Sequence, residues 1–338
     1  MKRIAIFADG TWNSPDEDNA SNVMQMARAV KPRVGKTQQI AFYDWGVGTD
    51  RKKIVGGITG AGIDKNIVDC YRFLVHNYHP GDKLFFFGFS RGAYTVRSLA
   101  GFIRNCGLLK REHADKIPDA FKLYRQRSKS SCPWEVKATR FRRDYAVADL
   151  TKIEFVGVWD TVGALGIPVP FWGALGKREF LFHDTEPSRI VQHARHAIAI
   201  DEVREDFEHT PWMEKKEMDI KEVWFAGSHG DVGGGYSSTG LSDCASQWMI
   251  DEAAQYGLKL EAHYLNDIEP KPSSKLHRSR RGIYLARGKS VRTIDGPIHS
   301  TAKKRWDRNP EKYRQRSYAL KQLLEKHGND WSAIEVVD

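Results

Sequence analysis

The chain of 338 residues has only four cysteines, and they are widely scattered. They form no C-x-x-C pair and no Cys/His cluster with metal-ligand spacing, which argues against a disulfide framework and gives no basis for structural zinc. Unpaired thiols are typical of a reducing compartment. The four positions are Cys70, Cys106, Cys132 and Cys244.

Long hydrophobic runs are also absent. The first residues reach Asp9 too soon for the hydrophobic region of a signal peptide, and no stretch approaches the ~20 apolar residues of a membrane span. We therefore expect a cytoplasmic protein, unless a dedicated secretion system exports it. Internal repeats and low-complexity segments are lacking as well, so the length suits one large α/β domain.

Acidic residues are scarce in two segments of a chain whose formal net charge is +10. Residues 271–316 hold fifteen Lys/Arg and three Asp/Glu, and residues 110–143 hold eleven and four. Such segments predict peripheral contact with an anionic membrane, or else they are solvated helix faces. Aromatic residues that could stack on bases are sparse in the carboxy-terminal segment, 271–316, which argues against nucleic acid as a partner.

Short apolar or β-branched runs predict buried parallel strands, and each of four runs ends in small or polar residues. In an open α/β sheet, such residues gather along one edge, beyond the carboxyl ends of the strands. A further strand is expected at 39–43. The four runs are 3–8, 83–87, 152–159 and 222–226.

This pattern predicts an α/β fold of the α/β-hydrolase type, with a mostly parallel sheet, helices on both faces and lid-like insertions. We expect a catalytic domain at 1–300, with insertions near 108–150 and 165–220. The second insertion is rich in aromatic residues and proline, which suits a lid. Residues 301–338 are expected to form a helical, basic extension packed on the same domain.

The most informative motif is Gly88-Phe89-Ser90-Arg91-Gly92. It follows a predicted strand and precedes a run with helical apolar spacing, which is the setting of a nucleophile elbow. Ser90 would be the nucleophile, and the backbone N–H of Arg91 would bind the oxyanion. The alternative is a serine in an ordinary tight turn between strand and helix.

A serine nucleophile needs a base and a carboxylate that orients the base. Asp160, directly after a predicted strand, has the position of the acid; its alternative role is a helix N-cap. His229 follows another strand and opens a glycine-rich loop, so it is the favoured base. His299 is the rival, since the histidine of such triads often comes late in the chain.

Five blocks of the sequence together resemble one family, the uncharacterised α/β-hydrolase domain family that includes the catalytic domain of type VI secretion phospholipase effectors. The resemblance implies a Ser/Asp/His triad, which here falls on Ser90, Asp160 and His229, and esterase chemistry on glycerophospholipids. The blocks are Phe7–Asn13, Gly88–Ala93, Gly157–Gly163, Ile200–Arg204 and Phe225–Tyr236.

The loop after the first strand is expected to supply a second oxyanion donor from the N–H of Gly10 or Thr11. Asp9, Asp201 and Asp231 would support the site. An ester or lipid is the expected substrate, and no cofactor or metal is expected.

Two other functions stay open. Asp9, Asp160, His229 and Asp231 could together bind a divalent ion in a metal-dependent phosphoesterase. Alternatively, the protein is catalytically inactive and binds a membrane or nucleic acid through its basic surface.

Overall fold

The computed structural model describes residues 1–10, 19–46, 60–126, 131–162, 189–212 and 218–338. In these ranges, the strands form one sheet of nine in the order β2-β3-β1-β4-β5-β6-β7-β8-β9, and neighbours are parallel except β2 and β3. The predicted mostly parallel α/β fold is confirmed. The strands are β1 (Lys2–Ala8), β2 (Arg33–Val34), β3 (Thr37–Asp44), β4 (Lys83–Phe89), β5 (Ile153–Trp159), β6 (Val191–Ala199), β7 (Asp219–Phe225), β8 (Ile298–His299) and β9 (Val336–Val337).

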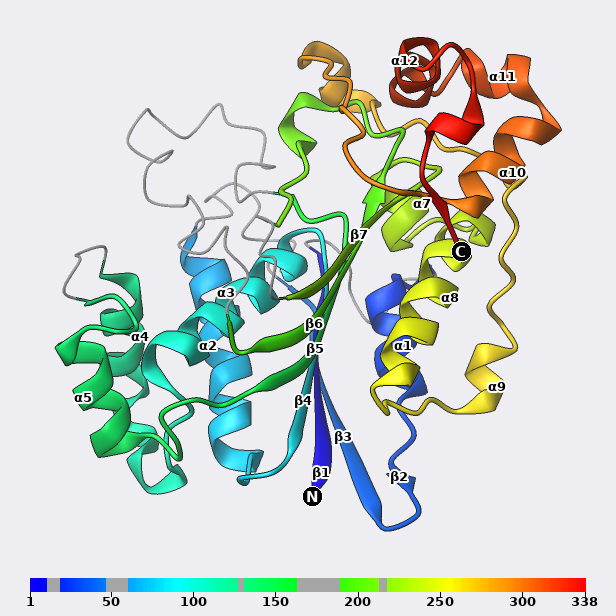
Figure 1. Ribbon diagram of the computed structural model, residues 1–338. Helices are drawn as coiled ribbons and strands as arrows, with labels where there is room; N and C mark the ends of the chain where they lie inside the picture. Colours follow the sequence, from blue (N-terminus) through cyan, green and yellow to red (C-terminus); the bar gives the residue numbers. More distant parts are fainter. Residues whose placement is uncertain (11–18, 47–59, 127–130, 163–188, 213–217) are drawn as a thin grey trace.

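Helices cover both faces of the sheet, as Figure 1 shows. Two separate apolar clusters fill the space between the sheet and these helices, which is why both faces of the central strands are apolar. One face carries α2 (Gly60–Asn77), α3 (Arg91–Cys106), α4 (Ile117–Arg125) and α5 (Val136–Tyr145), and the other carries α1 (Asn22–Ala29), α8 (Gly240–Gln255) and α9 (Ala262–Leu265).

Phenylalanine packing fixes the centre of the sheet. Phe7 of β1 stacks on Phe87 of β4 with ring centroids 5.0 Å apart, and Phe87 also contacts Phe155 of β5 at 5.6 Å. All three side chains are fully buried. Because the register places these strands side by side, Asp9, Ser90 and the end of β5 meet at the same edge of the sheet.

Strand β6 corrects one prediction, because it lies within residues 165–220, which were expected to be an insertion. Its sequence is polar for a central strand, yet its charges are matched across the fold. The Arg195 guanidinium binds Glu252 and lies 2.9 Å from an Asp219 carboxylate oxygen, and His196 Nδ1 lies 2.7 Å from Glu222 Oε1. The proline- and aromatic-rich part of the expected lid, residues 168–182, lies outside the described residues.

The carboxy-terminal part of the chain packs against β6 and β7. Trp306 and Leu320 belong to a third apolar cluster that also contains Ile198 and Trp224. The strand β9 then adds the last strand of the sheet beside β8. Among the described helices, none has both the length and the apolar character that crossing a membrane requires. The helices of this part are α10 (Ser300–Arg308), α11 (Pro310–Arg314) and α12 (Tyr318–Lys326).

Candidate active site

Ser90 lies in the sharp turn between β4 and α3. Its φ is 58° with ψ at −121°, a left-handed backbone that residues other than glycine rarely adopt. The N–H of Ser90 donates to the carbonyl oxygen of Trp159 at 3.1 Å, which ties the turn to the end of β5. The turn therefore has the strained geometry of a nucleophile elbow.

The two glycines of the motif are required by close backbone contacts. A β-carbon on Gly88 would lie 2.5 Å from the carbonyl oxygen of Gly92, and one on Gly92 would lie 2.0 Å from that of Ala8. No other residue fits at either position without moving the backbone. The elbow consequently packs directly on the end of β1, beside Asp9 and Gly10.

Asp160 and His229 meet at this edge of the sheet. His229 is the first residue of the short helix α7 (His229–Gly233), and its Nδ1 lies 2.6 Å from Asp160 Oδ2. The imidazole packs against Phe89, the residue before Ser90, with ring centroids 4.5 Å apart. The structure therefore pairs the predicted acid with the predicted base, next to the elbow.

A buried arginine that the sequence analysis did not identify holds the Asp160 carboxylate. Arg292 Nη1 lies 2.6 Å from Asp160 Oδ1, and Arg292 Nη2 lies 3.1 Å from Oδ2. The N–H of Ala199 donates to Oδ1 at 2.9 Å. Burial by itself would raise the pKa of Asp160, but the Arg292 charge and the His229 hydrogen bond hold it well below its ordinary value. Asp160 is thus a fixed carboxylate.

His229, the predicted base, is buried and is held through its backbone as well. Burial lowers the pKa of His229, and its hydrogen bond to Asp160 opposes that shift only in part. The imidazole is therefore neutral at pH 7 and able to accept a proton. Its backbone N–H donates to Glu202 Oε2 at 3.2 Å, and Glu202 in turn pairs with Arg204 at 2.9 Å. Glu202 lies within one of the five family-like sequence blocks, Ile200–Arg204, but the sequence alone indicated no role for it.

The predicted supporting residues lie around His229 without touching its ring. Asp231 Oδ2 accepts from the N–H and hydroxyl of Ser228, at 3.0 and 2.9 Å, and Asp231 Oδ1 lies 2.6 Å from His277 Nδ1. Asp201 Oδ2 accepts from the N–H of Gly227 at 2.8 Å. Both carboxylates therefore fix the turn that presents His229.

Asp9 is buried at the end of β1, and its hydrogen bonds are internal to the fold. It accepts from the Ser21 hydroxyl, from Tyr43 Oη at 2.8 Å and from the N–H of Gly10 at 2.7 Å. The Gly10 N–H is thereby already paired, and Thr11 lies outside the described residues. The second oxyanion donor stays a prediction, and Thr11 becomes its better candidate.

His299, the rival base, lies elsewhere. It caps α10, its ring stacks on Phe225 with centroids 4.4 Å apart, and its Nδ1 lies 2.7 Å from the Thr301 hydroxyl. Burial lowers its pKa to about 4. No carboxylate side chain forms a hydrogen bond with His299 within the described ranges, in contrast to His229.

The residues of the metal alternative do not converge on one point. Asp160 is paired with Arg292 and His229, whereas Asp231 is paired with Ser228 and His277. Across the described residues, no group of three or more His, Cys, Asp or Glu side chains is arranged to hold a metal ion. This arrangement favours acid–base chemistry over metal binding at these positions.

The fold and the geometry at the strand ends define an α/β-hydrolase-type domain. A family model described as the type VI secretion system phospholipase effector Tle1-like, catalytic domain, matches residues 2–252. The chain belongs to this family. The predicted resemblance is thereby confirmed.

Three known proteins to which the chain is similar are each longer than it is. An uncharacterized protein of Saccharomyces cerevisiae, YEL023C, is 29% identical over 231 residues, which are 61% of this chain and 32% of the yeast protein. A crystal structure of an uncharacterized protein from Pseudomonas aeruginosa matches with a TM-score of 0.48 and 19% identity, over 78% of this chain and 47% of that one. The structure of the Tle1 effector bound to the VgrG spike of the type 6 secretion system matches with a TM-score of 0.39 and 22% identity. The match covers 70% of this chain and 51% of that one.

Proposed function

We propose that the protein is a serine hydrolase that cleaves carboxylic ester bonds of phospholipids. The observation that carries the proposal is the 2.6 Å contact between His229 and Asp160, formed beside the strained elbow of Ser90. Family membership supports the same reaction class, because the matching model is that of a phospholipase effector domain. The chain spans about a third to a half of the length of the relatives it matches. The activity and the substrate of this chain are therefore proposed and are not taken over from those relatives.

In the proposed reaction, the Ser90 hydroxyl attacks the ester carbonyl while His229 Nε2 takes its proton. The alcohol leaves with a proton returned from His229, and a water molecule then releases the acyl group by the same steps in reverse order. Asp160 keeps the imidazole in the tautomer with a proton on Nδ1 and stabilises the imidazolium that forms. Arg292 acts through Asp160 as a positioning residue.

The oxyanion of the tetrahedral intermediate would lie at the start of α3. The N–H of Arg91 is the first of that helix and has no helical acceptor, so it is free to donate to the oxyanion. The end of β1 packs on the elbow and provides the second donor in this proposal.

The Arg91 side chain supports a phosphate-bearing substrate. Burial lowers the pKa of Arg91 to about 10, and Tyr284 is the titratable group that acts on its charge. Tyr284 packs edge-on against Phe207, which packs edge-on against His229, so the ring that acts on the Arg91 charge belongs to the same aromatic group as the proposed base. A guanidinium with no carboxylate partner among the described residues suits the phosphate of a glycerophospholipid.

Labelling with a fluorophosphonate probe tests the nucleophile. The probe should label the wild-type protein and not Ser90→Ala, whereas His299→Ala should label like wild type. Hydrolysis of phospholipid vesicles, measured by the release of fatty acid, should show the same pattern among the variants. Folded wild-type protein that fails to label would refute the serine mechanism. Chelator-sensitive activity that survives in Ser90→Ala would support the metal-dependent phosphoesterase instead.

A further inference from the structure

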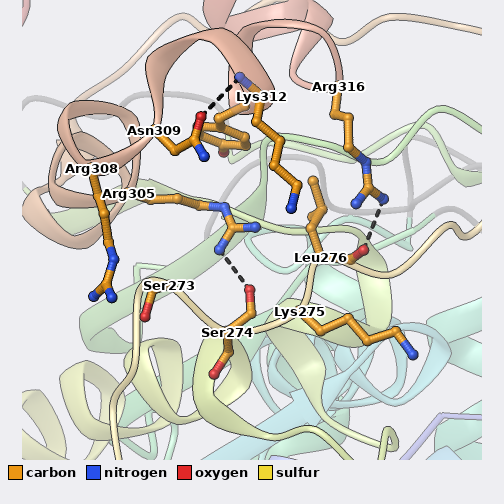
Figure 2. Close-up of a pocket in the computed structure, with 10 residues that line it drawn as sticks. Ser273, Ser274, Lys275, Leu276, Arg305, Arg308, Asn309, Lys312 and Arg316 are labelled. Carbon is orange, nitrogen blue, oxygen red and sulfur yellow. Dashed lines mark hydrogen bonds between the residues drawn. The ribbon is translucent and has the colours of Figure 1, made fainter.

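A second site lies at the carboxy-terminal end of the chain, apart from Ser90 and His229. A cavity of about 420 Å³ opens between the loop at 273–276 and the helices α10 and α11, and Arg316 completes its wall. Figure 2 shows the residues that line it. This volume falls within the ~300–1,000 Å³ typical of small-molecule sites.

The lining of the cavity is cationic. Half of its ten lining residues are Lys or Arg, and none of the ten is Asp or Glu. Figure 2 shows the amino group of Lys312 directed into the space between the guanidinium groups of Arg305 and Arg316. The five cations are Lys275, Arg305, Arg308, Lys312 and Arg316.

Two of these arginines are fixed in place by neutral groups. Arg305 Nη1 donates to the carbonyl oxygens of Pro272 and Ser274, at 2.5 and 2.7 Å, and Arg316 Nη2 donates to that of Leu276 at 2.8 Å. Carbonyl oxygens orient a guanidinium without neutralising its charge. Arg305 Nε is buried and has no hydrogen-bond partner within the described chain. The guanidinium groups are therefore held in place, but these contacts do not neutralise their charge.

The cations also act on one another. Burial lowers the pKa of Arg316, and the charges of Arg278 and Arg305 lower it further. Two carboxylates, Asp201 and Asp231, oppose this effect, and Asp201 is buried and accepts a hydrogen bond from the Tyr313 hydroxyl at 2.8 Å. Repulsion among fixed cations is relieved when an anion binds between them.

We propose that this cavity binds a phosphate-bearing anion through a terminal phosphate group. Such a phosphate carries a charge of about −1.5 to −2 at pH 7 and offers three acceptor oxygens, which match several arginine and lysine donors at once. Planar guanidinium groups favour phosphate over a single carboxylate oxygen. The hydroxyls of Ser273 and Ser274 and the Asn309 side chain add neutral polar groups to the lining.

Calorimetric titration with pyrophosphate tests the site directly. The double variant Arg308→Glu/Lys312→Glu changes two exposed side chains, so the fold should be preserved. Its affinity should fall about tenfold or more, because charge-assisted hydrogen bonds are lost. The control Lys36→Glu/Lys326→Glu makes the same change in net charge at exposed positions outside the cavity, and it should bind like wild type. Circular dichroism confirms that each variant is folded.

Vesicle binding distinguishes a lipid headgroup from a soluble phosphate. Phosphatidylcholine vesicles contain either phosphatidic acid, which has a terminal phosphate, or phosphatidylserine at equal surface charge. All proteins carry Ser90→Ala, so the result does not depend on the proposed hydrolysis. A preference for phosphatidic acid that the cavity variant loses indicates a lipid source, and pyrophosphate binding alone indicates a soluble one. Absence of both in wild type, or equal loss in the control variant, would overturn the proposal.

Discussion

Charged side chains are arranged in opposite ways at the strand ends and around the carboxy-terminal cavity. At the strand ends, two buried arginines have carboxylate partners: Arg292 pairs with Asp160 at 2.6 Å and Arg204 with Glu202 at 2.9 Å. Around the cavity, the hydrogen bonds of Arg305 and Arg316 within the described residues go to carbonyl oxygens. The charges of Arg292 and Arg204 are therefore paired before any ligand arrives, whereas the two cavity arginines have no carboxylate partner in the described part of the chain.

This difference follows from burial. The side chains of Asp160 and Arg292 are 0% and 3% exposed, and a charge removed from water to that degree must be paired. Arg308 and Lys312 face solvent, where water and salt screen their charges. Paired buried charges hold atoms in position for a reaction, whereas unpaired cations at an open cavity are suited to capture an anion.

The largest expected effect concerns Ser90 and His229 at the strand ends. Ser90→Ala and His229→Ala should each lower kcat by ~10³-fold or more, and the double variant should lose little beyond either one, because the triad acts as a unit. Rates of ester hydrolysis at saturating substrate measure this. The matched control is His299→Ala, which should keep its activity. An inactive His299→Ala beside an active, folded His229→Ala would reverse the assignment of the base.

The second prediction breaks the buried ion pair. Arg292→Met leaves the Asp160 charge without its partner, so the free energy of unfolding should fall by ~3–5 kcal/mol. The pKa of Asp160 should rise. Since Asp160 must be ionised to orient His229, the acid limb of the pH profile of kcat/KM should move to higher pH.

Arg287→Met is the control for Arg292→Met. Arg287 pairs with Asp206 at 2.9 Å, but both side chains are partly exposed, at 28% and 16%. This change should alter stability far less than Arg292→Met does and leave the pH profile unchanged, because solvent screens a partly exposed ion pair. Denaturant unfolding and initial rates measure both variants. An unshifted pH profile in Arg292→Met would limit Arg292 to a structural role.

Short-range patterns in the sequence were sufficient to predict much of the site. The strand before Ser90 is a continuous apolar run, and the flanking positions must be glycine because a β-carbon there would lie only 2.5 or 2.0 Å from a backbone oxygen, so local sequence carries that information. The observed β4 extends the predicted 83–87 by two residues. Asp160 was predicted because it directly follows such a strand, and His229 because it comes shortly after another.

Long-range charge pairing could not be predicted in this way. Arg292 lies 132 residues from Asp160, in a loop with no motif, so one sequence gives no sign of the contact. For the same reason β6 was not recognised as a central strand. Arg195 interrupts its apolar pattern, and its partners Asp219 and Glu252 lie far along the chain.

The third prediction asks whether Arg91 acts on the substrate phosphate. Arg91→Gln keeps the backbone N–H but removes the charge. KM for a phospholipid should rise by about tenfold, because one charge-assisted hydrogen bond is lost, while kcat/KM for a neutral ester such as p-nitrophenyl butyrate should change little. An equal loss for both substrates would mean that Arg91 supports the elbow and does not recognise phosphate.

The smallest expected effect concerns Asp201, which lies between the two regions. Burial raises its pKa to about 6 from 3.8. Between these pH values the folded protein holds a proton that the unfolded chain has lost, so this residue's contribution to stability falls as pH rises from about 4 to about 6. Asp201→Asn removes that titration and keeps an oxygen that can accept from the N–H of Gly227 or the hydroxyl of Tyr313.

The free energy of unfolding of Asp201→Asn, relative to that of wild type, should therefore rise as pH rises from about 4 to about 6. Above that range the difference between the two proteins should stay constant. Denaturant unfolding of both proteins across this interval measures the change. Asp307→Asn is the control, because Asp307 is exposed and pairs with Lys303 at 2.5 Å on the surface of α10, so its difference from wild type should remain small. A difference for Asp201→Asn that does not vary with pH would show that Asp201 is ionised in the folded protein throughout.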